Sequence, residues 1–207
     1  MNRPVVRGIE LFLIFFFGIH KNRRHLPEEQ CILISNHNSP LDTFVLASLF
    51  TGKHRASVRV VAAKDSFGKG IQGWLAKWIL QIVLVERHVQ GLQNPLEETS
   101  RLLREKFSLI IYPEGTRGEP GMMVPFKRGI GVLATQFPDI PIFPVFIQGV
   151  EKCLARNDHI LVPFEIGIRV SDEPFYGRDH IKEGKNLHEV SSQITQSLES
   201  RVRSLGT

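Results

Sequence analysis

The sequence predicts one α/β domain with a mostly parallel central sheet flanked by helices, preceded by a short membrane-associated helix at the N-terminus. Apolar runs of strand length alternate along the chain with helical patterns, and strands separated by helices form parallel sheets covered on both faces. A chain of 207 residues is long enough for one sizeable core and short for two. Nine consecutive apolar residues occupy positions 11–19. We therefore expect a membrane-associated segment at 1–25 and the main domain at 26–207.

Net charge and cysteine usage limit the partners and the compartment. The formal net charge is +5, which favours an anionic partner such as nucleic acid, a phosphate ligand or a membrane surface. The sequence lacks the aromatic and glycine pattern of an RNA-binding sheet and lacks zinc-finger spacing, so we expect no nucleic-acid partner. The two cysteines, Cys31 and Cys153, form no CxxC pair, which indicates a reducing compartment. Cys31 follows the pattern of a buried strand and is interpreted as core packing.

The apolar run at 11–19 is shorter than the ~20 residues that a membrane-spanning helix requires. A signal peptide is disfavoured because no small-residue cleavage site follows. A buried core helix is the structural alternative. Cations flank the run on both sides and would meet anionic headgroups if the run entered one leaflet. These cations are Arg3, Arg7, Lys21, Arg23 and Arg24. We therefore expect monotopic attachment at the cytoplasmic face of a membrane.

The predicted strands are short apolar runs, and the predicted helices lie between most of them. The strands are 31–34, 58–62, 82–85, 108–112, 140–147 and 160–170. The helices are 43–49, 91–107, a short helix ending near Gln136, and 186–202.

The two longest predicted helices carry distinct start signals and apolar faces. In the helix 91–107, Asn94 is predicted to cap the helix, Pro95 takes the first position, and Glu97 completes a capping box. The residues expected on its buried face are Leu96, Leu103 and Phe107. The residues expected on the buried face of the helix 186–202 are Leu187, Val190, Ile194 and Leu198.

A histidine and an aspartate follow the first strand of the main domain. Ser39 and Pro40 have the residue types of a helix cap and a first helical position, which would put Asp42 in the first turn. His37 lies just before this cap, so the Asp42 carboxylate can reach its imidazole. Such a carboxylate fixes the tautomer and leaves the other ring nitrogen as a base. The alternative is a loop histidine, with Asp42 acting only on the helix dipole.

Polar residues also follow two other strands. Arg87 comes after the strand 82–85, and the strand 108–112 is followed by Glu114, Gly115, Thr116 and Arg117. Ligands of parallel sheets bind beyond the carboxyl ends of the strands. We therefore expect these residues and His37 to share one site. The two guanidinium groups suit a phosphate monoester, although an isolated arginine is usually a solvated surface charge.

Four segments in order resemble the signature blocks of the 1-acylglycerol-3-phosphate acyltransferase family of glycerolipid acyltransferases. The first contains Asn36 and the spacing His37-x4-Asp42, and the other three are 82–87, 112–117 and 141–147. The resemblance extends from about residue 31 to residue 150. The second block departs from the family pattern at 84–87, where an aromatic residue and an aspartate are more usual. A glycine also follows Arg117 where serine is frequent.

The resemblance implies transfer of a fatty acyl group from an acyl thioester to a hydroxyl of a lysophospholipid, a step of phospholipid biosynthesis. The favoured acceptor is 1-acylglycerol-3-phosphate, which gives phosphatidate. Acyl-CoA and acyl-carrier protein are equally open as donor substrates, and no other cofactor is expected. His37 would be the general base, and Asp42 would orient it. The sequence contains no GxSxG elbow for a serine nucleophile, so direct attack by the acceptor hydroxyl is the simplest scheme.

The third block would bind substrate. Glu114 would accept a glycerol hydroxyl or hold Arg117 in place, and Gly115 would allow close backbone approach. Thr116 would donate to phosphate or serve only the turn, and Lys127 is a further candidate for anion contact. No cluster has convincing metal-ligand spacing, so no metal site is predicted. An acyltransferase acting on another lysolipid, a membrane-bound hydrolase and a non-catalytic lipid-binding module remain alternatives.

Overall fold

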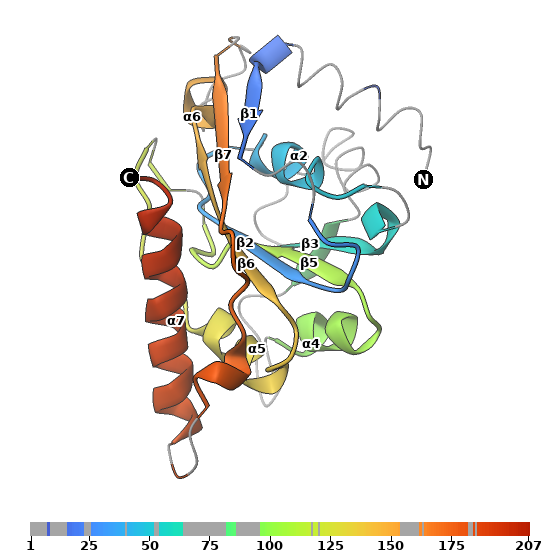
Figure 1. The fold of residues 1–207 in the computed structure, drawn as a ribbon, viewed down its shortest axis with the longest axis vertical. Coiled ribbons are helices and arrows are strands. Elements are labelled where there is room, and N and C mark those ends of the chain that lie inside the picture. Colours follow the sequence, from blue (N-terminus) through green and yellow to red (C-terminus); the bar gives the residue numbers. More distant parts are fainter. Residues whose placement is uncertain are drawn as a thin grey trace.

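The computed structural model describes 8, 16–22, 26–39, 41–51, 54–63, 82–85, 96–116, 118–119, 121–153, 162, 164–181, 184 and 186–207. Within this part, seven strands form one sheet in the order β1-β7-β6-β2-β5-β3-β4 (Figure 1). The strands are β1 (Ile19–Lys21), β2 (Ile32–Ser35), β3 (Val58–Ala63), β4 (Ile82–Val85), β5 (Ser108–Ile111), β6 (Ile142–Gln148) and β7 (Ile166–Val170).

The sheet is mostly parallel, which confirms the predicted fold class. Strands β2, β3, β4, β5 and β6 pair in parallel, and β1 is parallel to β7. Only β6 and β7 pair antiparallel among the described strands. The predicted strand 160–170 begins later than expected, at Ile166. Because β2 lies between β5 and β6, the carboxyl ends of these three central strands meet at one edge.

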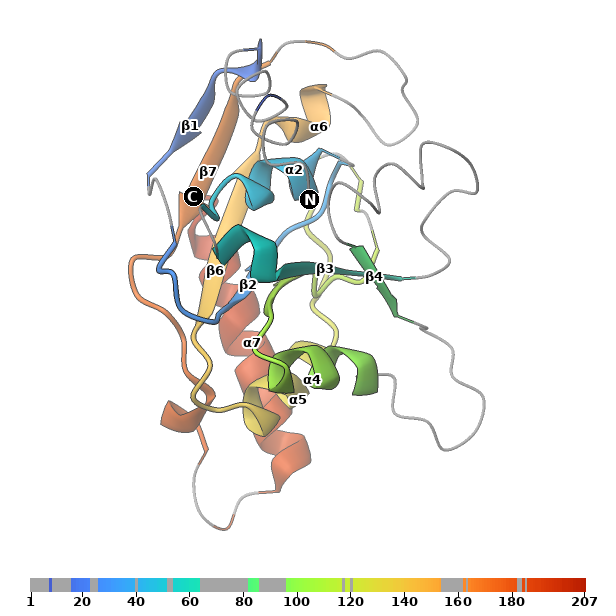
Figure 2. The ribbon, with the colours of Figure 1, turned by 90° about the vertical axis from the view of Figure 1, so that its right-hand side faces the viewer.

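Helices cover both faces of the sheet. They are α2 (Asp42–Ala47), α4 (Glu97–Arg104), α5 (Gly129–Gln136), α6 (Val150–Cys153) and α7 (Leu187–Ser204), with 3-10 turns η1 (His54–Ser57) and η3 (Gly177–Asp179). Figure 2 shows α2 on one side of the central strands and α4, α5 and α7 on the other. Successive strand residues point to opposite faces. In β2, Leu33 accordingly packs in the cluster that includes α2, whereas Ile32 and Ile34 pack with α4, α5 and α7.

The predicted face of α4 is confirmed. Leu103 is buried, and Leu96 and Phe107 pack against the same apolar cluster. The structure starts this helix at Glu97, whereas the predicted cap and first position, Asn94 and Pro95, lie outside the described residues.

The predicted start of α7 is also confirmed, but one member of its predicted face is wrong. The Asn186 side chain accepts a hydrogen bond from the His188 N–H at 2.9 Å, as a helix cap does. Val190, Ile194 and Leu198 are buried, whereas Leu187 is 65% exposed. The first turn of α7 extends below α5 (Figure 1), and in the described part of the chain Leu187 stays largely uncovered there.

The N-terminal segment 1–25 contains a strand of the main sheet. Ile19 of β1 pairs with Ile166 of β7, and Lys21 Nζ donates a hydrogen bond to Ser48 Oγ at 2.6 Å. The Asn22 side chain bonds both backbone groups of Val170 at 2.8 Å. These residues therefore belong to the sheet. None of the helices in the described ranges combines the length and apolarity needed to cross a membrane, and membrane association of the preceding residues stays a prediction.

The different burial of two leucines of α7 gives a test of the core. Leu198 is fully buried, whereas Leu187 is 65% exposed. Replacing Leu198 by alanine should lower the free energy of unfolding by about 2–5 kcal/mol, because it removes buried apolar contacts and leaves a cavity. The matched control Leu187→Ala should change it by less than about 0.5 kcal/mol. Urea unfolding of both variants measures the difference, and similar losses would contradict this placement of α7.

Candidate active site

His37 and Asp42 are in direct contact in the turn between β2 and α2. Nδ1 of His37 lies 2.9 Å from Oδ2 of Asp42, and Asp42 is only 1% exposed. The same oxygen accepts hydrogen bonds from the backbone N–H groups of Asn38 at 2.8 Å and Ser39 at 2.9 Å. A carboxylate bonded to Nδ1 keeps the proton on that nitrogen and leaves Nε2 as the proton acceptor. The predicted contact is therefore present.

The helix start that makes this contact differs from the expectation. Helix α2 begins at Asp42 with Leu41 at its N-cap, so the predicted cap at Ser39 lies two residues too early. Ser39 still serves the turn, because its Oγ accepts a hydrogen bond from the Leu41 N–H at 3.3 Å. The first helical position predicted for Pro40 lies outside the described residues.

Asn36 fastens the loop that carries His37 to the neighbouring strand. Its Nδ2 donates to the Ile147 carbonyl at 2.8 Å, and its Oδ1 accepts from the Ile147 N–H at 2.8 Å. The side chain thus extends the pairing of β2 with β6 beyond the last residue of β2. Sequence reasoning placed Asn36 in the first block without giving it a role. The sequence feature that could have indicated this role is the position of an amide side chain directly after a buried strand.

Tyr112 packs against the His37 ring. The ring centroids are 4.0 Å apart with an interplanar angle of 18°, and the Tyr112 hydroxyl lies 2.9 Å from Thr43 Oγ1. Burial, assisted by the nearby charge of Asp42, raises the pKa of Tyr112 well above its usual value, so this hydroxyl stays protonated near neutral pH. Tyr112 therefore fixes one face of the imidazole. No local pattern around Tyr112 predicts this contact.

Glu114 lies against the backbone of the His37 loop. It is 1% exposed, and its Oε1 accepts a hydrogen bond from the His37 N–H at 2.9 Å. Its Oε2 accepts from the Val124 N–H at 2.9 Å. Burial raises the pKa of this carboxyl group, although the two backbone N–H groups oppose the rise. The expected meeting of the first and third blocks is thus present, and substrate contact by Glu114 stays a prediction.

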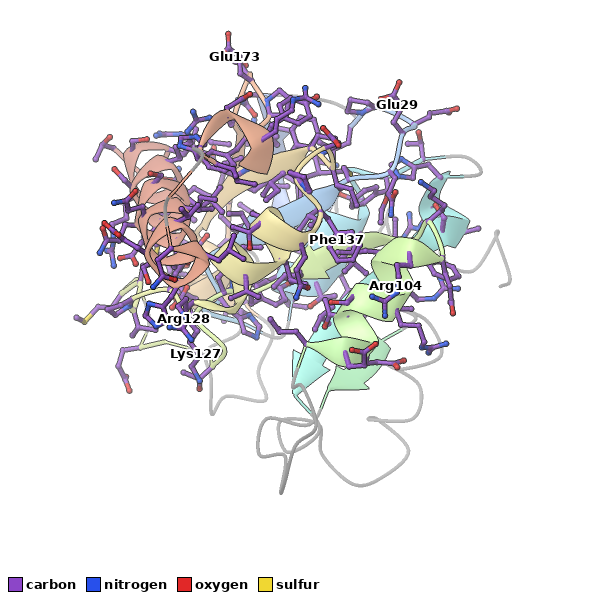
Figure 3. The ribbon with its side chains drawn as sticks, turned by 90° about the horizontal axis from the view of Figure 1, so that it is seen from below. Glu29, Arg104, Lys127, Arg128, Phe137 and Glu173 are labelled. Carbon is purple, nitrogen blue, oxygen red and sulfur yellow. The ribbon has the colours of Figure 1, made fainter. Side chains whose placement is uncertain are left out.

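The turn after Glu114 requires a glycine. Gly115 has φ +70°, and a Cβ there would lie 3.0 Å from side-chain carbons of Lys127. A larger residue would therefore be strained and would displace this lysine. Lys127 is tied to the turn by its backbone N–H, which donates to the Pro113 carbonyl at 2.8 Å. It lies beside Arg128, immediately before α5 (Figure 3).

The predicted phosphate-binding residues are only partly described. Thr116 is exposed in the turn after β5. Arg87 and Arg117 lie outside the described residues, so their position stays a prediction. The strand before Arg87 does form, since β4 ends at Val85 and pairs with β3.

Neither cysteine has the surroundings of a nucleophile. Cys31 is buried in the core, as expected, and burial raises the pKa of its thiol to about 12. Cys153 is fully buried, and burial raises the pKa of its thiol too. Reactive cysteines are partly exposed with a lowered pKa. In the described ranges, no three His, Cys, Asp or Glu side chains gather as metal ligands.

Comparison with known proteins identifies the family. Residues 19–148 match the protein-family model described as Acyltransferase. This chain belongs to the acyltransferase family. The matched region contains β1, the His37–Asp42 turn and the Glu114 turn.

Named relatives and one solved structure are similar to this family member. The chain is 26% identical over 175 residues to "1-acyl-sn-glycerol-3-phosphate acyltransferase alpha" of Homo sapiens, covering 82% of this chain and 60% of that protein. It is 29% identical over 143 residues to "1-acyl-sn-glycerol-3-phosphate acyltransferase" of Limnanthes douglasii, covering 69% and 49%. The chain thus spans 60% or less of these two relatives. The crystal structure of the 1-acyl-sn-glycerophosphate (LPA) acyltransferase PlsC of Thermotoga maritima shares its fold, with a TM-score of 0.67, 19% identity, and coverage of 96% of this chain and 80% of that one.

Proposed function

We propose that this protein transfers a fatty acyl group from an acyl thioester to the free hydroxyl of 1-acylglycerol-3-phosphate, giving phosphatidate. The observation that carries the proposal is the His37–Asp42 pair, held at 2.9 Å at the carboxyl end of a central parallel strand. The names of the relatives support the choice of acceptor. Acyl-CoA and acyl-carrier protein both satisfy the chemistry as donors.

In the proposed reaction, His37 Nε2 removes the proton from the acceptor hydroxyl as its oxygen attacks the thioester carbonyl carbon. The tetrahedral intermediate then collapses, the C–S bond breaks, and the imidazolium returns the proton to the departing thiolate. Asp42 stabilises the imidazolium through Nδ1–H. The reaction forms one ester and one free thiol.

The surroundings of His37 suit this role because they fix the ring before substrate binds. Tyr112 covers one face of the ring, and Asp42 holds one of its nitrogens. A base held in one orientation avoids the entropic cost of ordering it during the reaction.

The acceptor phosphate is proposed to bind at the second and third blocks. Arg87 and Arg117 would supply bidentate guanidinium contacts, and Thr116 and Lys127 would add hydrogen bonds. Gly115 lets the backbone approach the ligand closely.

A hydrolase with the same base is the competing function, since water could replace the acceptor hydroxyl. Mass spectrometry of lipids after incubation with a lysolipid panel and labelled acyl-CoA or acyl-carrier protein separates the alternatives. Acceptor-dependent labelled phosphatidate supports the proposal. Labelled free fatty acid without a new lipid would indicate a hydrolase, and lipid binding without turnover would indicate a non-catalytic module.

Replacing His37 by alanine should lower the transfer rate by about 10²–10⁴-fold, because it removes the general base. Asp42→Asn should be nearly as damaging, because the amide supports the wrong tautomer. Phosphatidate formation and thermal unfolding should be measured together to verify folding. The control Cys153→Ala should retain activity. A folded His37→Ala variant within a few-fold of the parent would refute the base assignment.

Replacing Arg87 or Arg117 by alanine should raise the KM for a phosphate-bearing acceptor, since each would lose a charge-assisted contact of about 1.5–3 kcal/mol. Steady-state kinetics with varied acceptor measures this effect. The surface control Arg101→Ala should leave the KM unchanged, because Arg101 pairs with Glu98 on α4. A loss confined to kcat would instead point to stabilisation of the oxyanion.

We further propose that the protein attaches monotopically to the cytoplasmic face of a membrane through its N-terminal apolar run and flanking cations. Deleting residues 1–15 spares buried Phe17 and strand β1. The deletion should shift the protein to the supernatant after vesicle sedimentation. It should also lower activity on vesicle-borne acceptor more than on a soluble short-chain acceptor. Full sedimentation of the truncated protein at high salt would rule out this anchor.

A further inference from the structure

Glu114 joins two separate backbone segments around the proposed base. Its Oε1 accepts from the His37 N–H, and its Oε2 accepts from the Val124 N–H, both at 2.9 Å. A third bond supports the same junction, because the Gly118 N–H donates to the His37 carbonyl at 3.0 Å. Both backbone groups of His37 are therefore held by the turn and loop that follow β5.

Substrate contact is a poor explanation for this carboxyl group. Glu114 is 1% exposed, and each of its oxygens already accepts a backbone hydrogen bond. A substrate hydroxyl could reach the remaining lone pairs of this carboxylate only by entering a site that is closed to solvent. A residue that fixes the backbone of His37 would make these two hydrogen bonds.

Oxygen atoms crowd the interior of this junction. Asn38 is 5% exposed, and its buried Oδ1 has no hydrogen-bond partner within the described ranges. A Cβ added at Gly118 would lie 3.5 Å from this atom, 3.5 Å from Glu114 Oε2 and 2.5 Å from the Met122 carbonyl. The loop can therefore close on the His37 segment only with glycine at position 118.

We propose that Glu114 is a positioning residue that sets the orientation of the catalytic base by clamping the His37 backbone to the loop at 118–124. The clamp acts on the backbone of His37, whereas Asp42 holds the ring itself through Nδ1. This inference rests on the proposed function for its kinetic consequences, whereas the clamp itself is a property of the backbone that can be measured without activity.

The kinetic experiment compares Glu114→Ala, Glu114→Gln and the exposed control Glu119→Gln. In Glu114→Ala, kcat should fall by about tenfold to hundredfold through misplacement of the base, with the acceptor KM within twofold of the parent. Glu114→Gln keeps one acceptor oxygen and should recover part of kcat. Glu119→Gln should match the parent. A raised KM with unchanged kcat would show substrate contact and overturn the proposal, as would unchanged kinetics in Glu114→Ala.

Amide hydrogen exchange tests the clamp independently of the reaction. The amides of His37 and Val124 should exchange at least tenfold faster in Glu114→Ala than in the parent. Gly118→Ala, which leaves the carboxylate in place but opens the loop, should accelerate the same two amides. Failure of the parent to form phosphatidate would refute the proposed function alone. Unchanged exchange at both amides in folded Glu114→Ala would refute the clamp alone.

Discussion

The site depends on the hydrogen bonds that the buried carboxylate of Asp42 accepts. A charge at 1% exposure is costly unless it is paired or hydrogen-bonded. Here a single oxygen accepts hydrogen bonds from the His37 ring and from the backbone N–H groups of Asn38 and Ser39. Because these donors are consecutive in sequence, satisfying the charge determines the shape of the turn and the orientation of the imidazole together.

The parallel sheet places this turn where other segments can hold it. Strand β2 pairs with β5 on one side and with β6 on the other, so the ends of all three strands lie at the same edge. Asn36 is bonded to Ile147 at the end of β6, and Tyr112 and Glu114 reach His37 from the end of β5. The apolar residues of β2 are buried on both faces, which gives the turn a rigid base.

The apolar run at 11–19 fits both a membrane-associated segment and the interior of the protein. Its apolar composition predicted attachment to a membrane, whereas Phe17 is in the core and Ile19 pairs within the sheet. Hydrophobicity alone cannot distinguish lipid from protein interior, since both remove apolar surface from water. The pairing of Ile19 with Ile166 of β7 places this part of the segment in the sheet.

Features that depend on local geometry could be predicted from the amino-acid sequence. Apolar runs predicted β2, β5 and β6, and Asn186 predicted the start of α7. Strand periodicity, helix periodicity and helix capping all depend on residues that are close together in the sequence. The His37–Asp42 contact joins residues five apart and was predictable for the same reason. The contacts of Asn36 with Ile147 and of Glu114 with His37 join residues 111 and 77 positions apart, and they could not be predicted in this way. These contacts depend on strand order, which is set by the packing of the whole sheet and its helices rather than by any local pattern.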